Sequence, residues 1–356
     1  MRTGVLRMAL WGLLAILLSV PGAGWGTAQQ QKPPQPPPEQ QQQQEYVVQA
    51  EVPLVNVDVV VADNNGNFLS GLKKENFRVL VDNQPQQITN FATTEAPITV
   101  VLLLEFSKLL WGWFYYETPA DNATFWAYQF LNELKKDDWV ALVTFDLKTR
   151  IEADFTRDKY AVGRVLARMY VPGFSEANLF DALIETLDRL QDVKGKKSIL
   201  ILATGFDTFS KHTLDDTLKR VRQTDVTIFA VGVARNIMER ADAYGAISGP
   251  GRVQYYQAEN QLNSFARITG GRAWFPQFDG QIPGIVREVA AMLRNQYSLA
   301  FIPPQKVRDG KFHKIKVEVV GDDGQPLVVV NQKGKRVKFA VFAREGFVAP
   351  KSGVAD

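Results

Sequence analysis

Long apolar runs alternate with amphipathic segments through the centre of the chain. Ile98–Leu104, Ser198–Ala203 and Val226–Val231 are almost entirely apolar, which is typical of strands covered on both faces. Between them, segments such as Phe125–Leu134 and Leu179–Leu190 place apolar residues at helical spacing. This alternation predicts an α/β domain with a doubly wound, mostly parallel sheet and helices on both faces.

Both flanks of this centre show the two-residue period of β-strands instead. On the N-terminal side, Val55, Val57, Val59 and Val61 alternate with their neighbours. The C-terminal side has four strand-like segments separated by Gly, Asp and Pro: Tyr297–Ile302, Lys314–Val320, Pro326–Asn331 and Val337–Phe342. We expect the two flanks to form one β-sandwich with the α/β domain inserted between them, because the N-terminal strands are too few to be stable alone. Two separate β-modules are the alternative.

The N-terminus has the features of a secretory signal. Arg2 and Arg7 precede the apolar run Met8–Val20, and small residues follow at 26–28. We expect cleavage before Gln29 and a periplasmic or secreted mature protein without a membrane span; an uncleaved anchor is the alternative. Residues 29–44 are almost entirely Gln and Pro, which predicts a disordered tether.

These patterns divide the chain into six parts. The expected parts are a signal peptide (1–28), a Gln/Pro-rich linker (29–45), the N-terminal part of the sandwich (46–94), the α/β domain (95–294), the C-terminal part of the sandwich (295–347) and a tail (348–356).

Composition excludes several classes of function. The 41 basic and 38 acidic residues nearly cancel, leaving +3, so no field gathers nucleic acid. The chain has no cysteine, which excludes disulfides, thiolate metal sites and thiol catalysis. With only two histidines, His212 and His313, zinc sites and histidine triads are disfavoured.

The order of motifs in the centre resembles the von Willebrand factor A family. The matching stretches are ITVVLLLEFS (98–107), DWVALVTF (138–145), NLFDAL (178–183), LILATGFDT (200–208) and TIFAVGV (227–233). Flanking stretches such as GLKKENF (71–77) and RNQYSLAFIP (294–303) resemble VWFA-related proteins of acidobacteria. The resemblance covers residues 50–347 and implies the same α/β fold that the hydrophobic pattern predicts.

The resemblance also implies a place for a divalent cation, the metal-ion-dependent adhesion site. Its donors are changed in this chain: Glu105 replaces an Asp, Leu109 a Ser, Ala177 a Thr and Thr204 an acidic residue, whereas Ser107 is kept. Such a set suits Mg²⁺ poorly. A rearranged cation site would use Glu105, Ser107 and Asp207; alternatively, Asp207 and the nearby Asp181 cap turns and helix starts.

Two other segments are candidates for recognition. Aromatic residues directly follow the first central strand: Trp111, Trp113, Phe114, Tyr115 and Tyr116. Such clusters are enriched at binding surfaces, although the first turn of a packed helix would also use them. Ala234–Glu259 contains Gly and Pro and reads as a long loop on the same side of the sheet.

We therefore expect an exported, non-catalytic module that binds a protein partner without cofactor. A cation-dependent adhesion module is the first alternative. A hydrolase using Glu105 and Asp207 as a carboxylate pair is the second, although no sequence motif supports catalysis.

Overall fold

The computed structural model describes residues 54–63, 66–93, 97–108, 123–169, 173–245, 249–330 and 334–349. The expected signal peptide and linker lie outside these residues. Among the helices of the described part, none is long and apolar enough to cross a bilayer.

A six-stranded sheet forms the centre, in the order β10-β9-β8-β5-β6-β7. Its strands are β5 (Thr99–Glu105), β6 (Trp139–Phe145), β7 (Thr149–Thr156), β8 (Lys197–Ala203), β9 (Thr227–Gly232) and β10 (Ala273–Trp274). All neighbours are parallel except β6 and β7. Every residue of β5, β8 and β9 is buried, as their continuous apolar runs require.

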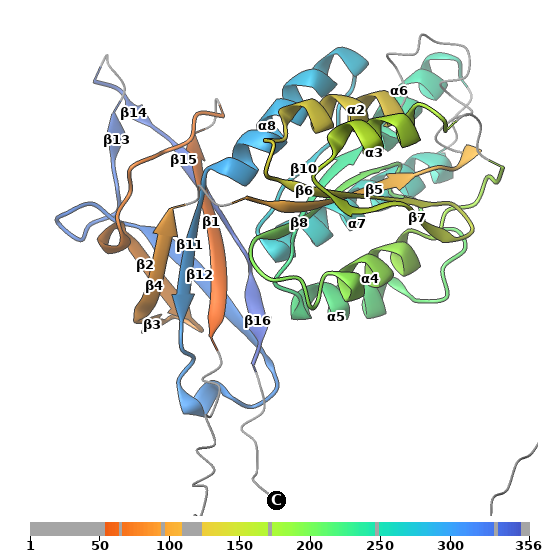
Figure 1. Ribbon diagram of the computed structural model, residues 1–356. Coiled ribbons are helices and arrows are strands. Elements are labelled where there is room, and N and C mark those ends of the chain that lie inside the picture. Colours follow the sequence, from red (N-terminus) through yellow and green to blue (C-terminus); the bar gives the residue numbers. More distant parts are fainter. Residues whose placement is uncertain are drawn as a thin grey trace, which may run out of the picture. The chain divides into compact units, whose positions relative to one another are not determined.

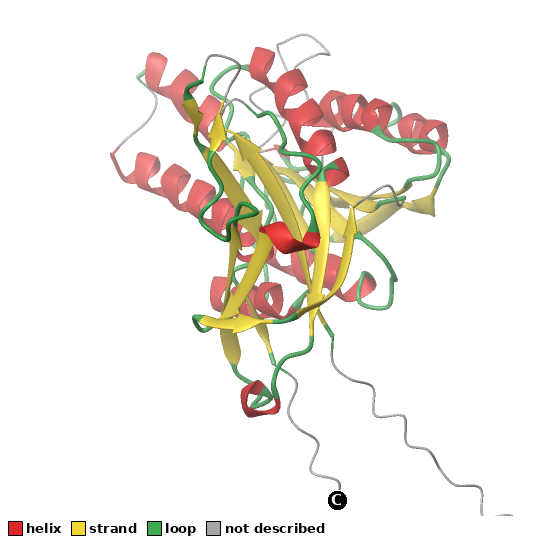
Figure 2. Ribbon diagram, turned by 90° about the vertical axis from the view of Figure 1, so that its left-hand side faces the viewer, coloured by secondary structure: helices red, strands yellow, loops and turns green. Residues whose placement is uncertain are grey.

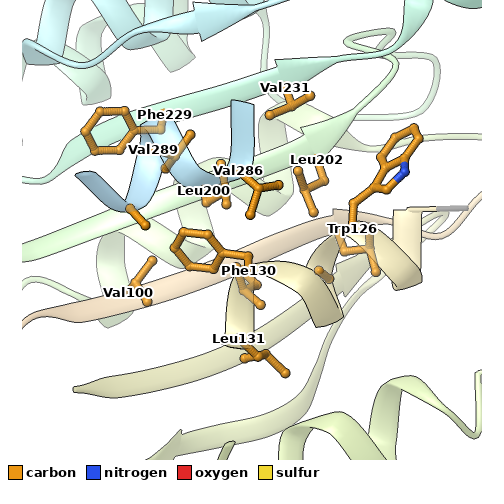
Figure 3. Packing of buried hydrophobic residues seen from close by; sticks show 14 of the residues in the cluster. Val100, Trp126, Phe130, Leu131, Leu200, Leu202, Phe229, Val231, Val286 and Val289 are labelled. Carbon is orange, nitrogen blue, oxygen red and sulfur yellow. The ribbon is translucent and has the colours of Figure 1, made fainter. Parts of the chain in front are cut away.

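Helices cover both faces of this sheet (Figure 1). One face carries α2 (Ala123–Glu133), α3 (Lys159–Leu166) and α8 (Ile282–Arg294); the other carries α4 (Leu179–Arg189), α5 (Leu214–Gln223) and α7 (Gly249–Thr269). Figure 3 shows Trp126 and Phe130 of α2 and Val286 and Val289 of α8 gathered against the strand residues of the first face. The predicted fold class is confirmed.

The flanking strands form two four-stranded antiparallel sheets, seen in Figure 2 from their own side of the molecule. The first contains β15 (Phe339–Ala343), β1 (Val55–Asp63), β11 (Gln296–Phe301) and β4 (Ile88–Thr93); the second contains β16 (Gly346–Val348), β12 (Phe312–Val319), β2 (Phe77–Val81) and β3 (Gln84–Gln86). A two-stranded ribbon joins β13 (Val329–Val330) to β14 (Arg336–Val337). Each four-stranded sheet mixes strands from both ends of the chain, so neither flank is complete without the other.

One sequence interpretation is wrong. Ala234–Glu259 is not a long loop: it contains α6 (Ala234–Ala243) and the first half of α7. The Gly and Pro residues that suggested a loop lie in the first turn of α7, where a missing backbone donor has no cost. The helix continues because Ala258, Leu262 and Phe265 are buried on its inner side.

Candidate functional site

The carboxyl ends of β5 and β8 lie side by side, because these strands pair in parallel from Thr99 opposite Lys197 onward. The chain leaves β5 at Glu105 and β8 at Ala203. In a doubly wound sheet, ligands bind at this kind of edge. Glu105, Ser107 and Thr204 meet here, and all three are fully buried.

Glu105 is enclosed by hydrogen bonds from its neighbours. Its Oε1 accepts from the Ser107 hydroxyl at 2.6 Å, and its Oε2 accepts from both the backbone N–H and the hydroxyl of Thr204, each at 2.7 Å. Burial raises the pKa of the Glu105 carboxyl, and these hydrogen bonds oppose the rise without cancelling it. The carboxyl group is therefore an internal link between β5 and β8 with no surface open to solvent.

This donor set does not fit the hard cation of the family's adhesion site. Glu105 already uses both oxygens on protein donors, and the hydroxyls of Ser107 and Thr204 both donate to it. Ala177 is fully buried and offers no side-chain oxygen. Leu109 lies outside the described residues. Within the described part, no group of three His, Asp or Glu side chains is placed to hold a metal.

Asp207 and Asp181 hold the loops of this edge together. Asp207 accepts from the backbone N–H of Phe180 at 3.0 Å and from the Ser210 hydroxyl at 2.5 Å. Burial raises the pKa of Asp207. Asp181 accepts from the backbone N–H groups of Lys211 and His212, each at 3.0 Å. Burial would raise the pKa of Asp181, but these hydrogen bonds outweigh it and lower that pKa. Both carboxylates thus support the turn after β8 and the start of α4.

Exposed apolar side chains surround this closed polar centre. Phe174 is 44% exposed, and its carbonyl accepts from the Lys108 N–H at 2.6 Å, next to Ser107. Phe209 is 57% exposed, and its N–H donates to the Ala177 carbonyl at 3.1 Å. Both exposed residues therefore lie on loops at the carboxyl-end edge of the sheet, with the backbone of Phe174 next to the end of β5.

The first half of α7 extends this apolar surface. Gly205, with φ +87°, packs so closely that a Cβ there would lie 2.7 Å from the Ala258 carbonyl oxygen. One turn earlier along α7, the Tyr255 ring meets Phe206 edge-on with centroids 5.0 Å apart. The adjacent Tyr256 is 50% exposed. Helix α7 thus rises beside the loop after β8 and presents Tyr256 near it.

Other aromatic residues were expected from the sequence to bind a partner. The segment from Trp111 to Tyr116 lies outside the described residues, so its place stays a prediction. Phe174 and Phe209 were missed, because neither lies in a dense aromatic segment. Tyr256 lies within Ala234–Glu259, which was expected to take part in recognition, but as a loop and not as a helix. For Phe174 and Phe209 the available signal was their position, before a helix and after a strand, on the edge that a parallel sheet uses for ligands.

Comparisons with known proteins agree with this architecture. Residues 121–267 match the family model of the von Willebrand factor type A domain. Similar solved structures include a von Willebrand factor type A protein from Catenulispora acidiphila, with 11% identity over 85% of this chain and 76% of that one, at a TM-score of 0.42. Another is BatB from Bacteroides thetaiotaomicron, with 15% identity over 56% of this chain and 100% of that one, at a TM-score of 0.40.

The PilB minor pilin from Streptococcus sanguinis is also similar, with 10% identity over 57% of this chain and 63% of that one, at a TM-score of 0.40. No curated protein matches the sequence. Identities and TM-scores this low transfer no function, so the assignment rests on the family-model match to residues 121–267. Residues 121–267 of this chain, within its α/β domain, are therefore identified as a von Willebrand factor type A domain.

Proposed function

We propose that this protein is an exported, non-catalytic binding module that holds a protein partner on the carboxyl-end face of its von Willebrand factor type A domain, without a divalent cation. Domains of this type generally serve as interaction modules. The observation that carries the proposal is the combination of a sealed polar centre at Glu105 with exposed apolar side chains around it.

Phe174, Phe209 and Tyr256 supply contact area of the kind that dominates protein interfaces. Large aromatic side chains are enriched at binding hot spots because they bury much surface with few rotatable bonds. A partner that covers them gains about 25 cal/mol per Å² of apolar area before the costs of association. The aromatic segment from Trp111 to Tyr116 follows β5 at the same edge in sequence terms and would add to this surface.

The hydrolase alternative is disfavoured by the same geometry. A catalytic carboxyl group must reach its substrate, but Glu105 is fully buried with both oxygens occupied. Asp207 is hydrogen bonded within its own turn. The two carboxylates therefore work as internal acceptors, and neither is poised as an acid or base.

Site-specific photocrosslinking tests the proposal. A photoreactive amino acid at Phe209, and separately at Tyr256, should trap the same protein from an extract of the source organism's cell envelope. The matched control carries the photoreactive group at Val328, which is 55% exposed but belongs to the sandwich side of the chain. EDTA should not change the yield, because the proposed surface uses no cation.

Equal trapping from Val328 would refute the assignment to this face. Loss of the crosslink in EDTA would instead favour the cation-dependent adhesion module.

A further inference from the structure

A second surface with its own chemistry lies between α2 and α3, which pack side by side on one face of the sheet (Figure 1). A groove of about 650 Å³ runs between these helices. Thr156, at the end of β7, pairs with Val140 near the start of β6. Because α3 begins just after β7, one end of the groove lies at the amino-end edge of the parallel strands. The groove is thus separate from the carboxyl-end face.

Four basic residues line this groove: Lys136, Arg157, Lys159 and Arg164. Among the described residues none of the four forms an ion pair, although most other arginines of the domain do. Lys159 donates to the carbonyls of Lys136 and Asp138, at 2.8 Å each, and not to a carboxylate, although the charges of Asp137 and Asp138 also act on it. The groove therefore concentrates positive charge in a chain whose overall charge nearly cancels.

The single acidic lining residue is already engaged. Asp158 caps α3, and its carboxylate accepts from the Ala161 N–H at 2.9 Å. It supports the helix start and is not placed to neutralise the lysine and arginine side chains by direct pairing. A ligand with carboxylates would supply the missing partners.

Aromatic and aliphatic side chains line the groove together with these charged residues. The Tyr128 ring lies over Gly163, where a Cβ would come within 3.0 Å of it, and Tyr128 remains 44% exposed. Tyr160, at 82% exposed, stands on the opposite helix, and Leu131 and Leu134 line the groove between them. Arg157 is held in place by stacking, with its guanidinium carbon 4.7 Å from the centre of the Trp139 ring.

We propose that the groove between α2 and α3 binds an acidic peptide segment of a partner protein, with apolar side chains between its carboxylates. The cations match carboxylates, and the tyrosines and leucines match apolar side chains. A sulfated polysaccharide would use the cations but would leave the aromatic and aliphatic side chains uncovered, and for this reason the observations favour the peptide.

Fluorescence polarisation with the full-length protein tests this. The probe is a short fluorescein-labelled peptide of alternating Glu and Leu residues, compared with the same peptide carrying Gln in place of Glu. We expect the Glu peptide to bind about tenfold more tightly or better, with an affinity that falls as salt is added.

The test variant is Lys136→Glu with Arg164→Glu, which should weaken binding of the Glu peptide about tenfold or more. Its matched control is Arg287→Glu with Lys306→Glu, which makes the same charge change at two exposed residues outside the groove. Tyr160→Ala, at a side chain too exposed to affect folding, should weaken binding several-fold. Thermal melting of each variant confirms that it is folded.

Three results would overturn the proposal. They are equal binding of the Gln and Glu peptides, equal weakening by the control charge reversal, and tight binding of heparin without binding of the peptide. The last result would assign the groove to an anionic polysaccharide.

Discussion

The buried ion pair between Asp138 and Arg294 offers the sharpest test of the packing. Asp138, which is 1% exposed, accepts from the backbone N–H of Ile98 at 3.1 Å and of Lys135 at 2.7 Å. Arg294, at the end of α8, donates to both of its carboxylate oxygens. Burial would raise the pKa of Asp138, but the hydrogen bonds from Arg294 and the two N–H groups lower it overall.

Arg294→Met should therefore destabilise the protein strongly. Breaking a buried pair costs about 3–5 kcal/mol, because the remaining charge stays buried without its partner. The Arg294 side chain is 20% exposed, so water can replace part of the interaction in the variant. We therefore expect a loss at the lower end of this range, about 3 kcal/mol. For a domain of this size that corresponds to a fall in Tm of about 6–12 °C.

The loss of stability in Arg294→Met should depend on pH in a defined direction. A carboxyl group with a lowered folded-state pKa contributes stability above its unfolded pKa and loses that contribution as pH falls. The difference between wild type and Arg294→Met should thus be full at pH 7 and shrink as pH falls towards and below about 4. Adding Asp138→Asn to Arg294→Met should recover part of the loss at pH 7.

Urea unfolding and thermal melting measure these effects. The control is Arg189→Met, which breaks the exposed pair with Asp154 (2.8 Å, side chains 38% and 70% exposed) and should cost less than about 1 kcal/mol. Equal losses of stability in the two arginine variants would contradict a special role for the buried pair. So would a failure of Asp138→Asn to restore stability to Arg294→Met at neutral pH.

Three further predictions concern the cation, the sandwich and export. Millimolar Mg²⁺ should not shift the melting temperature, because both oxygens of Glu105 already accept hydrogen bonds from the protein. A ligand at a hundredfold excess over its Kd would add about 2.7 kcal/mol to the free energy of unfolding, so binding would be visible. A clear shift that is lost in Glu105→Ala would favour the cation-dependent alternative. The Nδ1 and Nε2 atoms of His313 lie 2.7 Å from Asp82 and 3.0 Å from Asp309, and although burial lowers the pKa of His313, these two carboxylates raise it overall. The stability difference between wild type and His313→Gln in melting curves should therefore be full below the unfolded pKa of about 6.5 and be lost as pH rises through the raised folded-state pKa. Mass spectrometry of the native protein should find an N-terminus near Gln29, and an intact Met1 in the membrane fraction would contradict export.

Hydrophobic periodicity was sufficient to predict the layers of this protein. β5, β8 and β9 are continuous apolar runs, and such runs have few alternatives to a strand covered on both faces. The joint sandwich was predicted because the N-terminal flank has too few strands to form a stable β-domain by itself. The helical pattern of Leu262–Ile268 predicted the second half of α7, but its first half was missed because it carries mostly polar residues.

The candidate site was predictable only in part. The sequence revealed which metal donors were replaced, because each replacement sits in a recognisable motif. It did not reveal that Glu105 turns back to accept from Thr204, since that contact joins residues 99 positions apart. The basic groove was likewise hidden: Lys136, Arg157 and Arg164 come from separate segments that meet only when α2 and α3 pack together.

The pairing of β4 with β11 has a consequence for how such a protein can arise. Thr93, the last residue of β4, lies opposite Tyr297 in β11, so the chain leaves the sandwich and re-enters it at adjacent positions. β4 and β11 pair like the two strands of a β-hairpin, and the whole α/β domain takes the place of the loop between them. Replacing that loop requires only that the ends of the incoming domain lie close together. The α/β domain can therefore be exchanged as a unit, and its loops can diversify while the strands that carry it keep their pairing.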